Sequence, residues 1–393
     1  MNTVTVGIYI VSALCTIGWL TYLLRAAYHG SSILPLPKRD TINNAEKVSI
    51  IIAGRNEEKV IERCLYSLSS ITYPNIEFII VNDRSTDATG TILDTIAKTD
   101  SRIKPIHITS LPDGWLGKVN ALSVGVQHAT GDWLLFSDAD IHFEPDSILS
   151  AITYAQANEL DHLALLPDDR SQHEKFLVPL FVFAFGGLFI QRIKAKEIGK
   201  FGSKSYVGVG AFNLVRRSTF DKTPGFEWLK MEVIDDGGVG LMVHNAEGKS
   251  ALLDSNGLLS FEWYPTLREA IRGLEKNAFA GFANYSFPKA IIMVISMWLT
   301  AFFPIITGIV TQNILLITLT LFFYSFLPAL STVVMRSGVK IKPLIAASLP
   351  IGYFFISLGV LNSTLKAMKN GGLRWRDTFY SLDELRKGRR VSI

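Results

Sequence analysis

The sequence predicts an α/β domain with a mostly parallel sheet flanked by helices, placed between N-terminal and C-terminal transmembrane helices. Two observations carry this prediction. Strand and helix patterns alternate between Val48 and about Pro288, as expected for parallel βαβ units. Apolar runs that are almost free of charge lie on both sides of that region, and they are long enough to cross a hydrocarbon core of ~30 Å.

The first apolar run extends from Val4 to Leu24 and contains no charged residue. A signal peptide is the alternative, but no basic residue precedes the run and no small-residue cleavage site follows it. Arg25 follows the run directly, so the positive-inside tendency places the N-terminus outside and the chain beyond Arg25 in the cytoplasm. We expect a transmembrane helix in residues 1–28 and a linker in residues 29–47.

The central region, residues 48–265, is expected to form the sheet domain. β-branched runs predict strands, and apolar residues at helical spacing predict the helices between them. The expected strands cover residues 48–53, 77–83, 102–108, 132–137, 163–166 and 206–215. The expected helices cover residues 57–70, 89–98, 118–128, 145–158 and 232–245. Sheets of this kind bind ligands at the carboxyl ends of their strands.

Polar clusters stand at the ends of three of these strands, at Gly54–Glu57, Asn82–Asp83 and Asp138–Asp140. In an extended backbone Asp138 and Asp140 point the same way, and two carboxylates in one small volume repel each other unless they share a cation. Mg²⁺ is commonly held by one or two carboxylates together with substrate phosphates. A solvated turn is the alternative for an isolated pair, but three clusters at one sheet edge favour a binding site.

The last third of the chain is expected to return to the membrane. Residues 266–288 form a basic amphipathic helix, with Arg268, Arg272 and Lys276 opposite its apolar face. Residues 289–362 contain two to three membrane segments, and residues 363–393 form a basic tail.

Two predictions disagree about the side of the membrane on which the tail lies. Four full crossings from an outside N-terminus leave the tail outside, whereas its basic excess predicts the cytoplasmic side. A re-entrant or interfacial segment at Pro343–Leu361, which contains Pro350 and Gly352, would resolve the conflict. Another apolar stretch, Phe176–Ile190, is short for a span; it could lie in the membrane interface, line an acceptor groove or form a core helix.

Composition excludes several other classes of protein. The two cysteines, Cys15 and Cys64, supply neither a disulfide framework nor a zinc motif. The net charge of +4 is modest. Much of it lies in the tail, which suits an anionic membrane surface better than nucleic acid.

Six motifs stand in an order and spacing typical of one enzyme family. They are Ala53-Gly-Arg-Asn-Glu-Glu58, Val81-Asn-Asp-Arg-Ser-Thr-Asp87, Gly117-Lys-Val-Asn-Ala-Leu122, Asp138-Ala-Asp140, Gly210-Ala-Phe-Asn-Leu-Val-Arg-Arg217 and Asp235-Asp236. On these motifs, residues 48–253 resemble a family 2 glycosyltransferase with the GT-A fold, a nucleotide-sugar-binding domain with a Rossmann-like sheet. Leu111–Lys118 and Leu373–Tyr380 are similar to the membrane-bound subgroup that glycosylates lipids, which includes hopanoid-associated, carotenoid and ceramide glycosyltransferases.

The resemblance implies a donor site and a metal site. The implied donor-binding residues are Ala53, Arg55, Glu57, Asp83, Lys118 and Asp138. Asp83 would contact the uracil or ribose, and Lys118, at a helix N-terminus that favours anions, would face the diphosphate. Asp140 would bind a divalent cation, Mg²⁺ or Mn²⁺, with Asp138 near the ribose or bridging through water. Glu57 could equally cap its helix.

Asp235-Asp236 stands where the family usually has Glu-Asp. The resemblance implies that Asp236 is the general base for the acceptor hydroxyl, with Asp235 as the alternative. Asp235 could at the same time be a helix-capping carboxylate.

One departure from the family concerns its processive members, many of which carry Gln-x-x-Arg-Trp or Arg-x-x-Arg-Trp ahead of the final membrane helices. The only Arg-Trp pair of this chain is Arg374-Trp375, with Gly371 at the first position of the motif. We therefore expect a single transfer and keep Arg272, Arg374 and Trp375 as candidates for the acceptor or diphosphate side.

The resemblance thus implies an inverting enzyme of the cell membrane with a cytoplasmic catalytic domain. It would move a sugar from a nucleotide-diphosphate sugar, with UDP favoured, to a hydroxyl or carboxyl of a lipid-type acceptor. A processive polysaccharide synthase and a non-catalytic membrane scaffold with the same fold are the alternatives. No nucleic-acid partner is expected.

Overall fold

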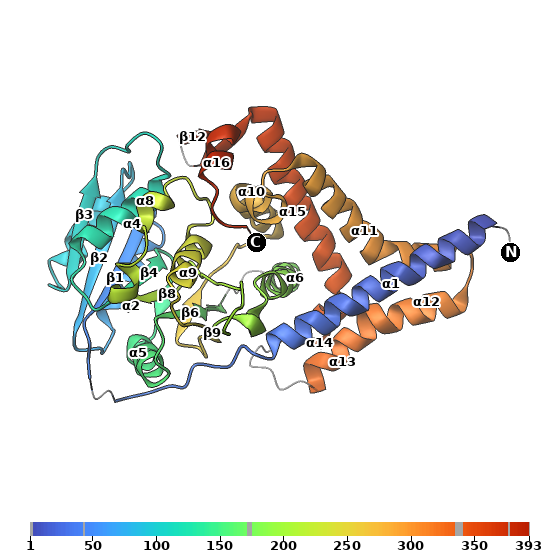
Figure 1. The fold of residues 1–393 in the computed structure, drawn as a ribbon, viewed down its shortest axis with the longest axis horizontal. Coiled ribbons are helices and arrows are strands. Elements are labelled where there is room, and N and C mark those ends of the chain that lie inside the picture. Colours follow the sequence, from blue (N-terminus) through green and yellow to red (C-terminus); the bar gives the residue numbers. More distant parts are fainter. Residues whose placement is uncertain (1–2, 42–43, 171–174, 335–340, 376–377, 393) are drawn as a thin grey trace.

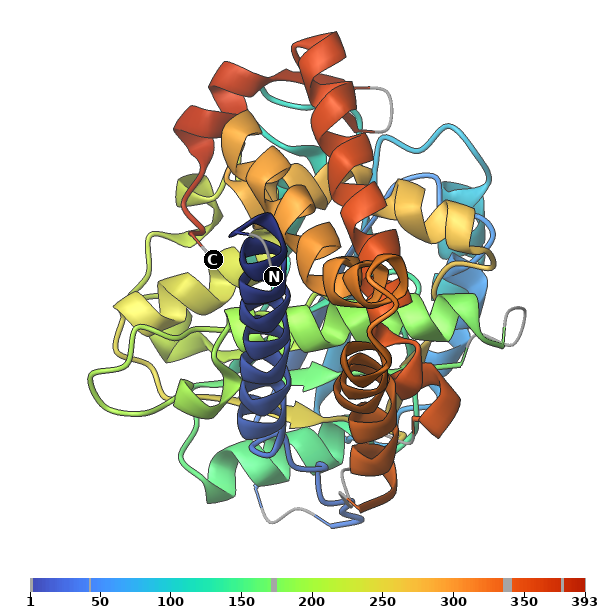
Figure 2. The ribbon, with the colours of Figure 1, turned by 90° about the vertical axis from the view of Figure 1, so that its right-hand side faces the viewer.

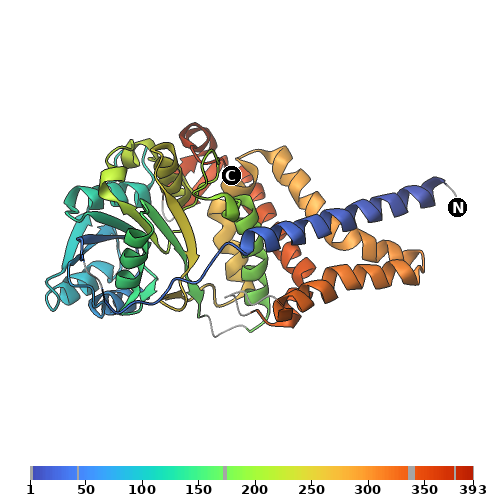
Figure 3. The same ribbon diagram turned by 60° about the horizontal axis from the view of Figure 1, so that its bottom comes forward.

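The computed structural model describes residues 3–41, 44–170, 175–334, 341–375 and 378–392. An α/β domain forms one end of the molecule and a group of apolar helices forms the other (Figure 1). The N-terminal helix α1 (Thr3–Gly30) extends away from the domain, and the C-terminal tail returns to it (Figure 3).

The domain is built on a mixed seven-stranded sheet in the order β3-β2-β1-β4-β8-β6-β9. β3, β2, β1 and β4 are parallel, β8 is antiparallel to both of its neighbours, and β6 and β9 are parallel. The bounds are β1 Val48–Gly54, β2 Ile76–Asp83, β3 Ile103–Ile108, β4 Trp133–Asp138, β6 His162–Leu166, β8 Asn213–Arg216 and β9 Ser250–Asp254.

Both faces of the central strands β1, β2 and β4 are buried, which explains their continuous apolar runs. Ile50 and Ile52 pack in one core with α2 (Ile61–Ser69), α3 (Thr89–Ala97) and α5 (Ser147–Ala157). Ile51, one residue out of phase, belongs to a second core with α4 (Gly117–His128). This second core continues through α9 (Asp235–Asn245) into the apolar helices, so a single body of buried side chains joins the two ends of the molecule.

The apolar end contains α1, α6 (Leu177–Arg192), α10 (Leu267–Ala283), α11 (Phe287–Val310), α12 (Ile314–Leu321), the π-helical turn η2 (Phe322–Phe326), α13 (Leu327–Val334), α14 (Pro343–Ala347) and α15 (Leu349–Asn370). In the described part of the chain, five helical stretches are long and apolar enough to cross a membrane: Thr3–Gly30, Leu177–Glu197, Phe287–Val310, Ile314–Ser331 and Leu349–Asn370.

These apolar helices differ in what they expose. α1, α11 and α12 expose many large apolar side chains, such as Leu14, Ile292 and Leu315, whereas no such side chain described in α6 is exposed. α6 and α15 also lie crosswise to α1 (Figures 1 and 2). Trp19 of α1 stacks on Tyr324 at a ring distance of 4.8 Å and meets Tyr353 of α15 edge-on at 5.4 Å.

Short elements complete the chain. They are β5 (His142–Phe143), β7 (Asp168–Asp169), β10 (Leu259–Phe261), α7 (Arg217–Phe220), α8 (Gly225–Trp228), η1 (Ala195–Glu197), the tail hairpin β11 (Gly372–Trp375) and β12 (Thr378–Ser381), and α16 (Leu382–Gly388). β5, β10 and β7 form a small separate sheet.

The linker after α1 is fastened to the domain. The Leu36 amide donates to the Asp254 carbonyl at 2.8 Å, and the Asp254 amide donates to the Leu34 carbonyl at 3.0 Å. Pro35 therefore runs beside the end of β9 as an isolated bridge.

One expected strand is much shorter than predicted. Of residues 206–215, only those from Asn213 onward form a strand, β8. The glycine-rich part before it instead crosses the first turn of α9, where a Cβ on Gly208 would lie 1.7 Å from the Asp236 carbonyl oxygen. A β-branched run with glycines in it is therefore only partly a strand here, because the glycines serve a close contact.

Candidate active site

The three polar clusters predicted at the sheet edge lie together. Ala53 of β1 is in register with Val81 of β2 on one side and with Asp138 of β4 on the other. Asp83 is therefore one strand away from the Gly54–Glu57 turn, and Asp138 flanks the same turn. This geometry follows from the parallel order of the strands.

Lys118 links the carboxylates of this edge. It lies in the first turn of α4, and its Nζ is 2.7 Å from Asp138 Oδ1 and 3.0 Å from Asp235 Oδ2. Gly117, directly before it, makes room for Asp83, since a Cβ there would lie 2.5 Å from Asp83 Oδ2. The side chain of Asp235 is 9% exposed, so this ion pair is well shielded.

Asp236 is held differently. Its Oδ1 accepts a hydrogen bond from the Gly237 amide at 2.8 Å, and its Oδ2 accepts one from the Gly210 amide at 3.1 Å. A Cβ on Gly210 would lie 2.6 Å from Asp138 Oδ2. The 208–210 segment is thus wedged between the two carboxylates, and the Gly-x-Gly spacing was the sequence signal for it.

A series of hydrogen-bonded buried polar groups ends at the backbone carbonyl of Asp236. His162 Nε2 is 2.5 Å from Asn213 Oδ1, and its Nδ1 is 3.1 Å from Ser250 Oγ. A neutral ring that donates through Nε2 and accepts at Nδ1 satisfies both contacts. Asn213 Nδ2 in turn donates to the Asp236 carbonyl at 3.1 Å. Sequence reasoning missed His162, because the three strands meet only in the fold.

The pKa values of the charged residues in this cluster shift in different directions. Burial acts to raise the pKa of Asp138, but the Lys118 ammonium holds it below the usual range. Burial and the Asp138 carboxylate raise the pKa of Asp140 to about 6. Burial and the adjacent Asp235 raise the pKa of Asp236 to about 6. Burial opposes the charge of Lys118, yet the surrounding carboxylates keep its pKa well above the ordinary value.

The residues present fit a hard divalent cation. Asp140 is accessible to solvent, and besides desolvation the carboxylates of Asp138 and Glu57 both raise its pKa, so a cation there would relieve repulsion. The described residues contain no group of three or more His, Cys, Asp or Glu arranged to hold a metal ion. Such an ion would need further ligands from a substrate, as Mg²⁺ commonly does.

The other predicted donor residues lie near this cluster with partners of their own. Arg84 binds the Asp83 carboxylate through both oxygens, at 2.7 and 2.9 Å. α2 begins at Ile61, and the amides of Val60 and Ile61 donate to the Glu57 carbonyl at 3.0 and 2.9 Å, so Glu57 meets the start of this helix through its backbone. Ala53 is half-buried at the end of β1, next to Arg55 in the turn.

The three candidates for the acceptor side differ in their exposure and contacts. Arg272 and Arg374 are exposed. The Trp375 ring instead lies under the ammonium of Lys276 on α10. Burial lowers the pKa of Lys276 to about 7, while Asp235 and Asp138 oppose this shift. Lys276 was not among the predicted site residues, although it lies one helical turn from Arg272 on the same face.

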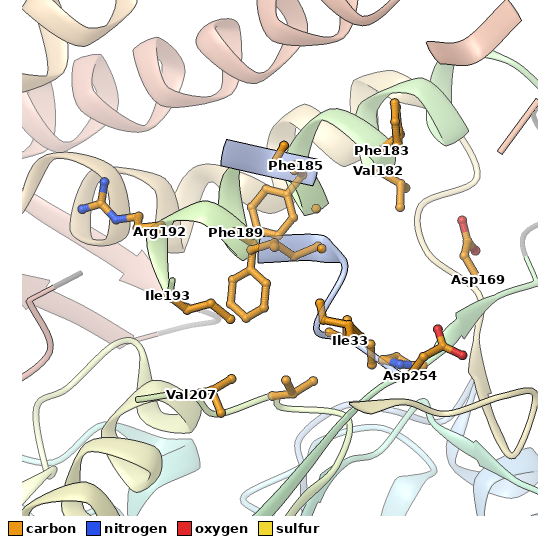
Figure 4. A pocket seen from close by; sticks show the side chains of 18 of the residues that line it. Ile33, Asp169, Val182, Phe183, Phe185, Phe189, Arg192, Ile193, Val207 and Asp254 are labelled. Atoms are coloured by element: carbon orange, nitrogen blue, oxygen red, sulfur yellow. The ribbon is translucent and has the colours of Figure 1, made fainter. Parts of the chain in front are cut away.

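A groove of about 2660 Å³ opens beside the carboxylates, between the α/β domain and the apolar helices. Figure 4 shows Phe185 and Phe189 of α6, Ile33 of the linker and Val207 around it. Trp263 adds an aromatic wall, with its ring 5.7 Å from that of Phe185. The groove also reaches Asp138, Asp140 and Asp236, so a mostly apolar channel leads to a charged end.

Comparison with known proteins gives the family of the domain. Residues 49–223 match the model of glycosyl transferase family 2. An uncharacterized glycosyltransferase of Haemophilus influenzae is 30% identical over 167 residues, which are 42% of this chain and 44% of that protein. The chain thus aligns with less than half the length of that relative, and with 27% of a putative glycosyltransferase of Bacillus subtilis.

Two longer matches extend beyond the α/β domain. A 4,4'-diaponeurosporenoate glycosyltransferase of Staphylococcus haemolyticus is 22% identical over 289 residues, which are 72% of this chain and 74% of that protein. The solved structure of a mannosyltransferase from Pyrobaculum calidifontis, in complex with GDP-Man and Mn²⁺, superposes with a TM-score of 0.59 at 15% identity. That superposition covers 93% of this chain and 99% of the other, and it shows the GT-A fold. With its motifs, its sheet and this family match, the α/β domain of the chain belongs to glycosyl transferase family 2.

Proposed function

We propose that the protein is a membrane-bound glycosyltransferase that moves one sugar from a nucleotide-diphosphate sugar to a hydroxyl or carboxyl of a lipid-type acceptor. One observation carries the proposal. The cluster of Lys118, Asp138, Asp140 and Asp236 lies at the end of a mostly apolar groove formed with the apolar helices. A charged donor and an apolar acceptor would meet there.

The donor would bind at the strand ends of β1, β2 and β4. Lys118 would lie against the diphosphate, where a helix N-terminus also favours an anion. Asp140, with Asp138, would hold a divalent cation, and that cation would neutralise the departing diphosphate. The mannosyltransferase of similar fold binds GDP-Man with Mn²⁺, which supports a nucleotide sugar and a cation; a UDP sugar remains our first choice of donor.

Asp236 would take the proton from the acceptor. The acceptor oxygen would attack the anomeric carbon from the face opposite the diphosphate, and the bond to the diphosphate would break. A single displacement needs no covalent sugar–enzyme intermediate, so the configuration would invert. Asp236 suits this role better than Asp235, because the carboxylate of Asp235 is already paired with Lys118.

Two observations support a lipid-type acceptor: the lining of the groove and the name of a relative. The groove is lined by Phe185, Phe189 and other apolar side chains, and a relative that covers 72% of this chain acts on diaponeurosporenoate by name. A single transfer fits the absence of an Arg-Trp motif ahead of the final membrane helices.

The membrane placement follows from exposure and direction. α1, α11 and α12 with α13 would cross the bilayer, since they expose apolar side chains along their length. α6 and α15, which lie crosswise to α1, would lie at the interface. In this arrangement residues 48–265 form a catalytic domain on the cytoplasmic face of the cell membrane, residues 266–288 lie on that face, and the tail, residues 363–393, shares the same side.

The proposal is tested with purified protein in lipid nanodiscs, lipid extract, Mn²⁺ and a panel of UDP and GDP sugars. Release of nucleoside diphosphate that depends on the lipid, with a lipid product heavier by one sugar residue in mass spectrometry, is the expected result. Products carrying long sugar chains would favour the polysaccharide synthase. Failure to bind any nucleotide sugar would instead favour the non-catalytic scaffold.

A further inference from the structure

The loop before α9 connects the two halves of the charged cluster. Its Lys230 carbonyl accepts a hydrogen bond of 2.7 Å from the Leu116 amide, directly before the helix that carries Lys118. Its other end is the Asp235-Asp236 pair. This loop therefore joins the start of the helix that carries Lys118 to the two carboxylates.

A buried carboxylate lies inside the loop. Glu232 is only 1% exposed. Its Oε1 accepts from the Ile234 amide at 2.9 Å, and its Oε2 accepts from the amides of Arg390 and Val391 at 2.6 and 2.9 Å. A buried charge is costly unless hydrogen bonds compensate it, and two of these three bonds come from the tail.

The tail is packed against the same loop on both sides of Glu232. A Cβ on Gly388 would lie 2.2 Å from Met231 Cβ. Arg390 Nε donates to the Trp228 carbonyl at 3.2 Å. Val391 is 2% exposed and lies near Gly237, where a Cβ would be 3.7 Å from its side chain.

The same tail residues also reach the glycine-rich segment. The Ser392 amide donates to the Tyr206 hydroxyl at 3.2 Å. Tyr206 is close in sequence to Gly208 and Gly210, which contact Asp236 and Asp138. Residues far beyond the last apolar helix are thus bonded to both segments that hold Asp236.

We infer that residues 389–392 form a tail latch that positions Asp236 through the buried carboxylate of Glu232. Glu232 is a positioning residue in this account, since it reaches the reaction only through the loop. The catalytic consequence rests on the proposed function, whereas the mechanical link between the tail and the loop does not. Loss of the latch leaves Glu232 buried with one acceptor oxygen unpaired, so the loop must rearrange to hydrate it.

The test compares Glu232→Gln with Glu227→Gln in the full-length protein in nanodiscs. Glu227 is a matched control, because it lies in the same region but is exposed and contacts Lys230 at 2.9 Å. Hydrogen–deuterium exchange followed by mass spectrometry reports on the loop, and steady-state kinetics report on transfer.

In Glu232→Gln, we expect amides 234–240 to exchange about tenfold faster, as for a local opening made easier by one hydrogen bond or more. We expect kcat to fall by about tenfold or more, since small displacements of a reacting group are costly, while the KM for the donor stays within about twofold. Glu227→Gln should leave both readouts at the wild-type level.

A second variant disturbs the tail latch from the tail instead of from Glu232. Gly388→Val forces the tail away from Met231 and should give the same local exchange and the same selective loss of kcat. Unchanged exchange in both variants, or faster exchange at wild-type kcat, would overturn the inference, as would faster exchange throughout the domain. If the wild-type protein transfers no sugar, the proposed function fails, and the exchange experiment still decides whether the latch exists.

Discussion

Asp140 differs from Asp138 in its balance of charges. Asp138 is paired with Lys118 at 2.7 Å, whereas desolvation and the carboxylates of Asp138 and Glu57 outweigh Lys118 at Asp140 and raise its pKa to about 6. The carboxylate that a bound cation would stabilise most is therefore Asp140.

Asp140→Asn tests this assignment. We expect kcat to fall by about 10²–10³-fold, as when one group that stabilises developing charge is removed, and the Mn²⁺ concentration for half-maximal rate to rise. Initial rates over a Mn²⁺ titration measure both effects, and chelation of the metal should abolish wild-type transfer. Asp146→Asn, at an exposed position, is the control; a variant with wild-type rate and metal dependence would remove Asp140 from the metal site.

The raised pKa of Asp236 leads to a prediction about how kcat depends on pH. A general base must be deprotonated, and burial beside Asp235 raises its pKa to about 6. The kcat should therefore fall about tenfold per unit as the pH drops below about 6, whereas an ordinary aspartate would keep its activity down to about 4. A kcat profile from pH 4.5 to 8 at saturating donor measures this. A limb near 4, or full activity of Asp236→Asn, would contradict the role.

The site residues could be predicted from the sequence to the extent that they follow strands. Asp138 and Asp140 end a run of buried apolar residues, and parallel strands end at one edge. Lys276 and Trp375 could not be found in this way, since they meet only when α10 and the tail hairpin pack together. The Arg-Trp motif drew attention to Arg374, but of the two residues only the tryptophan lies against the ammonium of Lys276.

Among the elements, β6, β8 and β9 are joined by the side chain of His162, which is neutral in the folded protein at pH 7. Burial lowers the pKa of His162 to about 4, and the ring bridges Asn213 and Ser250. The unfolded chain binds a proton at this position near pH 6.5, so between pH 6.5 and 4 the unfolded state holds more protons.

The domain should therefore lose stability as the pH falls through this window, by up to about 3 kcal/mol from this one group. Thermal midpoints of wild type and His162→Gln at pH 7.5 and 5 measure the effect. The difference between the two proteins should narrow at pH 5, because only the wild type has an imidazole at this position that gains a proton on unfolding. His128→Gln, at an exposed histidine, should follow the wild type; a constant difference would refute the prediction.

The apolar helices make a second prediction at this scale. Trp19 is 1% exposed and contacts aromatic rings from η2 and α15. Trp19→Ala should destabilise the protein by about 3–5 kcal/mol, as for other large-to-small core changes. Leu14→Ala on the same helix, where the leucine is 62% exposed, should cost far less. Thermal midpoints in one detergent compare the two, and equal losses would mean that α1 is held by its lipid-facing side chains.

Element boundaries show where sequence reasoning is accurate and where it fails. The strands β1, β2 and β4 match their apolar runs within two residues, because burial of both faces needs such runs. The helix expected from residue 232 begins at Asp235 instead, because Glu232 bonds to the tail. The length of the apolar stretch in α6 fitted either an interfacial or a core position. That α6 lines the groove and packs against α15 could not be predicted from this length.

For the whole molecule, the tail returns to the domain, although the last long apolar helix separates them in sequence. α15 ends at β11, which lies near α10 beside the domain. This contact supports our proposal that the tail and the domain share one side of the membrane, as the basic excess of the tail predicts.

Cysteine labelling measures this arrangement. In a background with Cys15 and Cys64 replaced, Asp383→Cys in the tail and Glu159→Cys in the domain should react with a membrane-impermeant maleimide in inverted vesicles only. Thr311→Cys, between α11 and α12, should react from the opposite side. Labelling of the tail from the side of Thr311 would contradict the arrangement.

The linker fastened to β9 adds a last consequence. Because Leu34 and Leu36 bond to Asp254 only a few residues after α1 ends, an α1 that crosses the bilayer would hold the proposed active site at a fixed height above it. Under the proposed function, the protein would then select acceptors by length. A hydroxyl carried at the matching distance from its hydrocarbon anchor would come within reach of Asp236, and one on a longer or shorter headgroup would not, whatever the chemistry of the anchor.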